Sequence, residues 1–337
     1  MGCTLNLVHG EDLAWQERKG TSFIMTPKYC GYDVWYEKLL RPGQREKRGQ
    51  ASDGYRLTKD YAYPDGGVYI GTAMAISGAA VSPNMGYHSS PALAFLMTVF
   101  NVRLGQWMGN PRDQKCWRKP APRIGLGYLL TELFGLTGDH SRYVYLSDGG
   151  HFENLGIYEL VKRRCRLILA VDAAEDKDLS FDDLASAVRK CRSDMGIDIE
   201  IKTDKLHKVG KTGFSPWHCA IGLIKYCNSD PPIDNLPAGS DKTVKDGILV
   251  YVKPSLTNDE PADVLNYKRM HPVFPHEPTV DEWFSESQFE SYRALGQHVI
   301  RTLFCGGGLS KDLSTIDIDD LIRCLQRDWN DPETINL

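Results

Sequence analysis

The segment from Tyr143 to Ala173 restricts the fold of this chain more strongly than any other part of the sequence. The apolar run RYVYL is followed by the pair Gly149-Gly150, by a stretch with helical character up to Arg164, and by a second apolar run, LILAVDA. A run such as LILAVDA is typical of a parallel strand that is buried on both faces. The order strand, turn, helix, strand therefore predicts an α/β fold.

Further helices and strands are predicted from local patterns. Ser180 and Asp183 form a capping box, apolar residues recur after them at helical spacing, and Gly196 is expected to end this helix. Asn154 is expected to cap the helix that runs to Arg164. The remaining predicted elements are strands over 197–202, 220–226 and 247–253, and helices after Ser90-Pro91, over 286–304 and over 318–329.

Composition excludes several classes of protein. The 337 residues carry 40 basic and 44 acidic side chains, a net charge of −4, so no basic field is available to recruit nucleic acid. No apolar run reaches the roughly 18 residues that a membrane-spanning helix needs. The nine cysteines include no C-x-x-C pair, and their odd number argues against a complete disulfide framework. We therefore expect a globular protein in a reducing, cytoplasmic compartment.

Asp148 is the strongest candidate for a catalytic residue. It ends an apolar strand, at the edge where open α/β sheets place their sites. Gly149 and Gly150 follow, which permits positive φ angles and a close approach of substrate. The helix that begins near Asn154 would direct its positive end toward this turn, so the carboxylate would stay ionised and accept a proton. The alternative interpretation is that Asp-Gly-Gly is an ordinary tight turn.

The neighbours of Asp148 favour the catalytic interpretation, because His151, Glu153 and Asn154 add more polar groups than a turn requires. The string YLSDGGHFENLGIYELVKRRC resembles the Asp-bearing segment of the patatin-like phospholipases, including their cytosolic phospholipase relatives. The resemblance, which is to a bacterial subgroup of this family, extends from about Leu5 to Leu303 and includes the stretches 73–112 and 271–296.

This resemblance implies a patatin-like fold, with a central, mostly parallel sheet flanked by helices, and a Ser–Asp dyad in which Asp148 is the base. Gly149, Gly150, His151 and Asn154 would support the turn. The reaction would be hydrolysis of a lipid acyl ester, of phospholipase or lipase type, with no metal and no cofactor. The substrate would be a lipid or phospholipid ester, and peripheral membrane contact is an expectation for the full-length protein.

One motif of the family is missing. The nucleophilic serine of these enzymes lies in G-x-S-x-G, upstream of the Asp, and this chain contains no such string. We therefore expect the nucleophile in an upstream half or an upstream polypeptide, and we expect the chain alone to be inactive. The expected segments are an irregular region over 1–67, the C-terminal part of the catalytic domain over 68–304, and a linker with a final helix over 305–337.

Serines within the chain are poor substitutes for this nucleophile. Ser77 lies among small residues, in AISGA, but lacks the two glycines of a nucleophile elbow. Close packing beside the catalytic strand is the simpler role for Ser77, which remains a low-ranking candidate. Ser147 is adjacent to Asp148, and adjacent residues of a strand point to opposite faces. The missing nucleophile also favours an alternative function, that of a catalytically inactive scaffold or assembly module.

Two other kinds of site are weighed for the same turn. A dinucleotide site is excluded because the glycine pair does not continue into the fingerprint G-x-G-x-x-G. The residues available for a metal site are Asp148, His151 and Glu153, with His140 or His88. One tight turn would have to direct three of these side chains at a single ion, which is an uncommon arrangement. The sequence therefore predicts no metal site.

Overall fold

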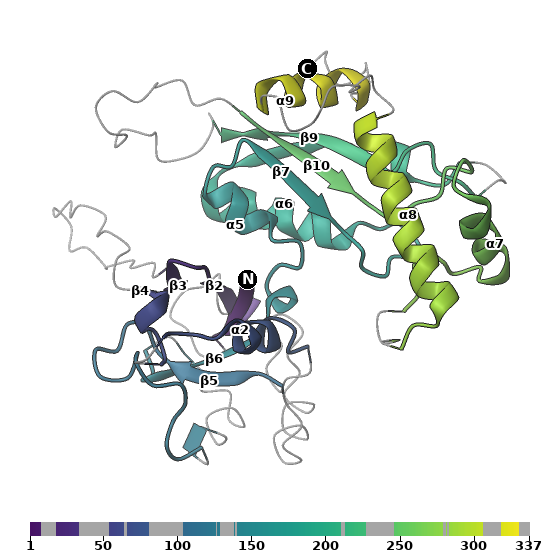
Figure 1. The fold of residues 1–337 in the computed structure, drawn as a ribbon. Coiled ribbons are helices and arrows are strands. Elements are labelled where there is room, and N and C mark those ends of the chain that lie inside the picture. Colours follow the sequence, from purple (N-terminus) through teal and green to yellow (C-terminus); the bar gives the residue numbers. More distant parts are fainter. Residues whose placement is uncertain are drawn as a thin grey trace. The chain divides into compact units, whose positions relative to one another are not determined.

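The structure is a computed structural model of the 337-residue chain. It describes residues 1–7, 18–33, 54–63, 66–80, 104–125, 127–128, 138, 140–209, 213–226, 246–278, 281, 283–305 and 318–329. The chain divides into two compact units, Met1–Asn154 and Leu155–Leu337, which are described separately (Figure 1). Helices and strands occur in both units, so the mixture of helices and sheets expected from the sequence is found.

The first unit contains a six-stranded antiparallel sheet with the order β4-β3-β2-β1-β6-β5. Its strands are β1 (Gly2–Asn6), β2 (Gly20–Met25), β3 (Tyr29–Gly31), β4 (Tyr55–Leu57), β5 (Gln106–Gly109) and β6 (Tyr143–Asp148), and its helical elements are η2 (Thr58–Asp60), α2 (Ile70–Ser77) and η4 (Gly149–His151). Cys3 lies opposite Phe23 on β2 and opposite Asp148 on β6. The N-terminal strand is therefore the direct neighbour of the strand that carries Asp148.

The region 1–67, which we expected to be irregular, supplies four strands of this sheet. The core beneath them includes Leu5, Phe23 and Leu146, which have no exposed surface. Two features conceal these strands in the sequence. Thr4 and Asn6 are buried together with their apolar neighbours, so β1 does not alternate. In addition, β3 and β4 have three residues each, which is too short for a recognisable period.

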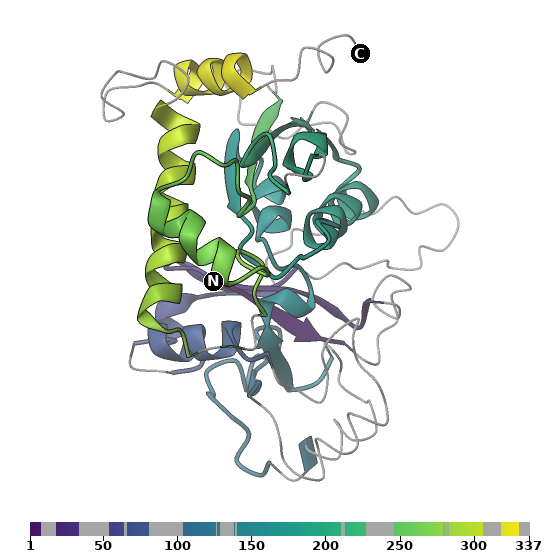
Figure 2. The same ribbon diagram turned by 90° about the vertical axis from the view of Figure 1, so that its right-hand side faces the viewer.

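The second unit contains a four-stranded sheet with the order β7-β10-β9-β8. Its elements are α5 (Ile157–Lys162), β7 (Leu167–Val171), α6 (Asp182–Met195), β8 (Asp198–Ile201), η5 (Asp204–Leu206), β9 (Cys219–Lys225), β10 (Gly247–Val252), α7 (Ala262–Met270), α8 (Glu286–Cys305) and α9 (Ile318–Trp329). Figure 2 shows the long yellow-green α8 on one side of this sheet and the teal α5 and α6 on the other. Side chains of β10, α8 and α9 share one hydrophobic core, so this unit is a layered helix–sheet–helix structure.

The mostly parallel sheet that we expected is not found. In the described part of the chain, β7 and β10 form the one parallel pair, whereas β10–β9 and β9–β8 are antiparallel, as is the whole first sheet. The run LILAVDA does form a strand, but Leu169 is 46% exposed and Val171 58% exposed. The run of apolar residues correctly predicted a strand. Its position at the edge of the sheet depends on which strands pair with it, and a local sequence pattern does not specify those strands.

Two predicted helix caps are also wrong. The helix α5 begins at Ile157, after Gly156 in the left-handed conformation with φ 72°, so Asn154 is not its cap. Phe181, with φ 54°, precedes α6, and no side chain caps that helix, because the Ser180 hydroxyl donates to Asp176 at 3.1 Å. The predicted end of α6 at Gly196 is confirmed, with φ 63°.

Several predictions fall on residues that the structure does not describe. They include the helix after Ser90-Pro91, His88, and the first part of the segment 305–337.

Among the described residues, no helix combines the length and apolar character needed to cross a membrane. The six cysteines whose side chains the structure describes are free thiols.

Candidate functional site

Asp148 is the last residue of β6, at the point where a buried strand turns into the short helix η4. The preceding residues Tyr143–Ser147 are all buried, and Asp148 is half-buried. Its Oδ1 accepts the Gly150 N–H at 2.6 Å, and its own N–H donates to the Ala79 carbonyl at 3.4 Å. No other described residue hydrogen-bonds its carboxylate, so one oxygen is held in place and the second is available to accept a proton.

The two glycines after Asp148 are needed for close packing rather than for positive φ. Neither has a φ angle in the left-handed range, because both belong to η4. A Cβ on Gly149 would lie 2.7 Å from the Gly2 carbonyl oxygen, and one on Gly150 would lie 2.8 Å from Asn154 Oδ1. The close neighbours of the two glycines are therefore β1 and Asn154, whereas the predicted close approach of substrate stays a prediction.

His151 is part of a hydrogen-bonded chain behind the turn. Its Nε2 lies 3.2 Å from the Ala80 carbonyl, which can only accept, so Nε2 carries the ring proton. The Nδ1 of a neutral ring is then the acceptor, and the Ser147 hydroxyl donates to it at 2.9 Å. The Asn6 amide donates in turn to Ser147 at 2.8 Å. Ser147 is fully buried, so this Ser–His contact connects β1, β6 and η4 without access for an ester.

Ser77 is the last residue of α2, so it occupies a helix C-terminus and not a strand-to-helix elbow. Its hydroxyl donates to the Gly2 carbonyl at 2.7 Å, and it makes no hydrogen bond to Asp148. The Gly2 carbonyl also borders Gly149, so Ser77 lies near the turn, which the sequence does not reveal. A helix C-terminus carries partial negative charge and disfavours an oxyanion. The geometry therefore gives Ser77 little support as a nucleophile.

In the second unit, a buried ion pair lies where the parallel strands β7 and β10 end. Lys253 is 1% exposed and Asp172 2% exposed, and their Nζ and Oδ1 atoms are 3.0 Å apart. Asp172 also accepts the Tyr251 hydroxyl at 2.5 Å and the Ala174 N–H at 3.0 Å. Burial raises the pKa of Tyr251, and the hydrogen bond to Asp172 raises that pKa further. All these partners stabilise the buried charges.

Asp176 extends this network toward the start of α6. Its carboxylate accepts the Ser180 N–H at 2.8 Å, the Ser180 hydroxyl, and the Phe181 N–H at 2.9 Å, and it lies 3.9 Å from Lys253 Nζ. Burial alone would raise the pKa of Asp176, but the hydrogen bonds and the Lys253 charge together lower it. The carboxylate is therefore more acidic in the folded protein than in the unfolded chain.

This lowered pKa predicts a pH-dependent contribution to stability. A carboxyl group with a depressed folded pKa stabilises the fold above its unfolded pKa, and that stabilisation is lost as pH falls through the folded value. We expect Asp176→Asn to lower the free energy of unfolding by about 1–2 kcal/mol at pH 7. The difference should shrink below about pH 4, which urea titrations at several pH values would measure. A difference that stays constant down to pH 2 would contradict this assignment.

A group of potential ligands, which the sequence analysis missed, lies at the same sheet edge. His218 precedes β9, Asp259 and Glu260 lie between β10 and α7, and His298 belongs to α8. One ligand atom from each of these residues lies within 4.8 Å of those from the other three. Burial lowers the pKa of His218, although Glu260 acts in the opposite direction, and the Thr257 hydroxyl lowers the pKa of Asp259.

No local pattern reveals this group in the sequence. Its residues come from three separate segments, and the two histidines have neither helical nor strand spacing. The residues that we considered as metal ligands at the Asp148 turn are not arranged in this way. Among the described residues, Asp148, His151, Glu153 and His140 do not form a group with ligand geometry.

Comparisons of this chain with protein-family models, with curated proteins and with solved structures find no match. The resemblance to patatin-like phospholipases therefore depends on the sequence motifs quoted above alone.

Proposed function

We propose that this chain carries the catalytic base of a serine acyl hydrolase that acts on lipid esters. The observation that carries the proposal is the carboxylate of Asp148, which has one oxygen held by the Gly150 N–H and the other without a hydrogen-bond partner among the described residues. Asp148 also ends a buried strand and lies in the segment SDGGHFENLG, which resembles the Asp-bearing turn of the patatin-like family. The patatin-like fold is part of this proposal and is supported by the motif rather than by the antiparallel sheet around β6.

The proposed reaction has two steps. A serine in a G-x-S-x-G segment outside this chain attacks the ester carbonyl while Asp148 takes its proton. Asp148 then gives this proton to the leaving alcohol as the acyl-serine forms. In the second step Asp148 deprotonates a water molecule that attacks the acyl-serine, and it returns the proton to the serine oxygen as the fatty acid is released. His151 has no part in the proton transfer, because its two ring nitrogens are engaged by the Ser147 hydroxyl and by the Ala80 carbonyl. It positions the turn, together with Asn154 beside Gly150.

A second candidate function is an inactive scaffold, and it is supported by a specific observation. The hydrogen bond from Gly150 to Asp148 would stabilise the start of η4 in a protein with no catalytic role. The two serines near this turn also donate their hydroxyl protons elsewhere, Ser77 to the Gly2 carbonyl and Ser147 to His151, so neither donates to Asp148. The two functions differ in what happens when a nucleophile is supplied.

We therefore expect the purified chain alone to be inactive. Catalysis of this type needs an activated serine and hydrogen-bond donors for the oxyanion, and loss of a single donor costs about 10²–10³ in rate. The chain should not hydrolyse p-nitrophenyl butyrate above background and should not be labelled by a fluorophosphonate probe. Fusion or co-expression with the upstream segment that carries G-x-S-x-G should restore both hydrolysis and labelling.

Two results would change these assignments. If the isolated chain is labelled and Ser77→Ala removes the labelling, then Ser77 is the nucleophile and the dyad lies within the chain. If the completed enzyme has no hydrolase activity toward a panel of phospholipid and short-chain esters, the scaffold function is favoured.

A further inference from the structure

The loop after β10 surrounds a single hydroxyl group with an excess of hydrogen-bond acceptors. The Thr257 hydroxyl lies 3.1 Å from His218 Nε2 and 3.3 Å from Glu260 Oε1, and it also contacts Asp259 Oδ1. A hydroxyl has only one proton to donate, so at most one of these three acceptors is fully satisfied by it. The lone pairs of His218, Asp259 and Glu260 therefore surround the Thr257 hydroxyl, and such a group of acceptors is suited to binding a cation.

His218 is oriented as a metal-binding histidine would be. Its Nδ1 is 3.0 Å from the Ser255 carbonyl, which can only accept, so Nδ1 carries the proton and Nε2 of the neutral ring presents its lone pair toward the Thr257 hydroxyl. The side chain is 2% exposed, and its Nε2 faces the acceptor group. Metal-ligating histidines almost always donate their second N–H to a carbonyl or carboxylate, which fixes the ring in this way.

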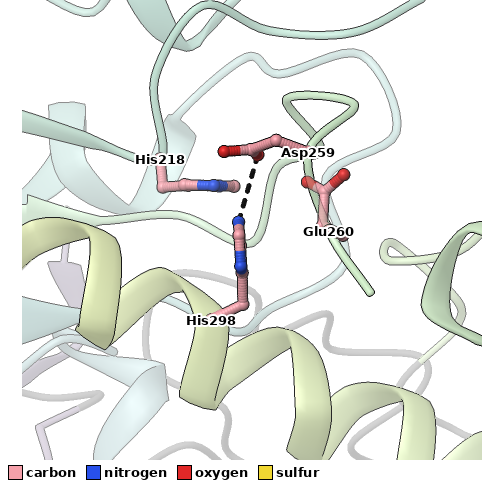
Figure 3. Close-up of side chains that lie close together, drawn as sticks. All are labelled: His218, Asp259, Glu260 and His298. Atoms are coloured by element: carbon pink, nitrogen blue, oxygen red, sulfur yellow. Dashed lines mark hydrogen bonds and ion pairs between the residues drawn. The ribbon is translucent and has the colours of Figure 1, made fainter. Parts of the chain in front are cut away.

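His298 and Asp259 complete a set of two histidines and one carboxylate (Figure 3). His298 Nε2 donates to Asp259 Oδ1 at 3.1 Å, so a metal ion would replace the proton of this hydrogen bond and the ring proton would move to Nδ1. The rings of His218 and His298 have centroids 5.4 Å apart at 85°. The Asp259 side chain is 63% exposed, whereas that of His298 is 17% exposed. One side of the group is therefore open to solvent, as in zinc sites that keep a position for water or substrate.

Glu260 adds a second carboxylate from the buried side. It is 5% exposed, and its oxygens accept the Thr257 N–H at 2.6 Å and the Asn258 N–H at 3.0 Å. These bonds hold the loop in shape and leave lone pairs on both oxygens, since each carboxylate oxygen has two. Glu260 therefore orders the loop and still offers a fourth oxygen ligand.

We propose that His218, His298 and Asp259, with Glu260 as the fourth ligand, bind a divalent transition-metal ion of the zinc class. Two imidazoles with two carboxylates favour such an ion over Ca²⁺ or Mg²⁺, which prefer oxygen ligands alone. Zinc bonds to nitrogen and oxygen are about 2.0–2.2 Å long, so the ligand atoms of a tetrahedral site lie about 3.3–3.6 Å apart. The present atoms lie within 4.8 Å of one another, so metal binding requires the most distant pair to approach by about 1.2–1.5 Å.

This site is independent of the proposed hydrolase function. All four residues belong to the unit Leu155–Leu337, whereas Asp148 and its turn belong to Met1–Asn154. Among the described residues this is the one group with ligand geometry. The alternative is that the same contacts attach the loop to α8 without any ion.

The experiment uses the full chain, freed of metal with a chelator and titrated with zinc chloride by isothermal calorimetry. The ligand variants are Asp259→Asn and His298→Gln. The matched controls are Asp263→Asn and His271→Gln, two exposed residues of the same unit that lie outside the group. Far-UV circular dichroism confirms that each variant is folded. Cobalt titration of the wild-type protein reports the ligand geometry through its visible absorption.

We expect one zinc ion per chain in the wild-type protein and in both controls, and binding at least about 10–100-fold weaker in the two ligand variants. Zinc should raise the melting temperature of the wild-type protein but not that of Asp259→Asn. The absence of zinc binding by the wild-type protein would overturn the proposal, as would equal affinity in the ligand variants. The cobalt titration uses the wild-type protein and therefore does not depend on the folding of any variant. A cobalt spectrum without the visible absorption of a four- or five-coordinate ion would also overturn the proposal.

Discussion

Asp148→Asn is expected to lower ester turnover of the complete enzyme by about 10²–10⁴-fold, the usual contribution of a general base. The neutral amide is too weak a base to take the serine proton, but its oxygen can still accept the Gly150 N–H that Asp148 accepts at 2.6 Å. The fold should therefore survive, with a change in unfolding free energy below about 1 kcal/mol. Steady-state hydrolysis of a phospholipid ester, combined with urea denaturation, measures both effects.

Asp113 offers a matched control for this variant. It is a half-buried aspartate of the same unit, and its Oδ1 accepts two backbone N–H groups, from Lys115 at 2.8 Å and Cys116 at 2.7 Å. Asp113→Asn should leave turnover unchanged. Near-wild-type hydrolysis by Asp148→Asn would exclude Asp148 as the base.

His151→Ala should cause a smaller loss of ester turnover than Asp148→Asn. A complete loss of turnover in a folded His151→Ala variant would instead indicate a histidine base.

Lys253→Met is expected to cause the largest loss of stability, about 3–5 kcal/mol, because it leaves the buried Asp172 carboxylate without its cation. The two side chains are 1% and 2% exposed, so water cannot replace the lost partner. Lys225→Met is the control in the same sheet, since Lys225 is 27% exposed and 3.5 Å from Glu200. That surface pair should contribute less than about 1 kcal/mol. Urea denaturation followed by circular dichroism measures both variants.

A second substitution separates the lost charge pair from lost packing. In Lys253→Met combined with Asp172→Asn, neither buried charge remains, so the double variant should be more stable than Lys253→Met alone. The Tyr251 hydroxyl, which donates to Asp172 at 2.5 Å, can still donate to the introduced amide oxygen. A loss below about 1 kcal/mol in Lys253→Met would mean that the pair does not stabilise the sheet edge. A double variant no better than the single one would assign the loss to packing.

Local patterns correctly predicted elements whose signal lies within a few residues. The helices over 286–304 and 318–329 correspond to α8 (Glu286–Cys305) and α9 (Ile318–Trp329). The strands over 197–202, 220–226 and 247–253 correspond to β8, β9 and β10 within one or two residues. One local prediction was wrong before α6, where Asp176 accepts the Phe181 N–H and the expected capping box does not form.

The two candidate sites differ in how far the sequence reveals them. The Asp148 turn is continuous in sequence, so the strand, the carboxylate and the glycine pair were all predicted, although the neighbour that requires Gly149 to be small is Gly2 on β1. The ligands at the second site come from segments that are remote in sequence. His218, Asp259 and His298 meet only because β9 and β10 pair and α8 covers their sheet.

Short stretches of the sequence predicted a fold of mixed helices and strands, most helix and strand positions in the second unit, and the candidate base Asp148, because apolar period, helix-ending glycines and turn chemistry are local signals. The pairing and direction of the strands follow instead from contacts between distant segments. The tertiary structure converted an expected irregular N-terminus into four strands, placed Ser77 beside the Asp148 turn, and assembled the group around His218. Strand pairing and burial depend on contacts between remote segments, and a local pattern contains no information about those partners.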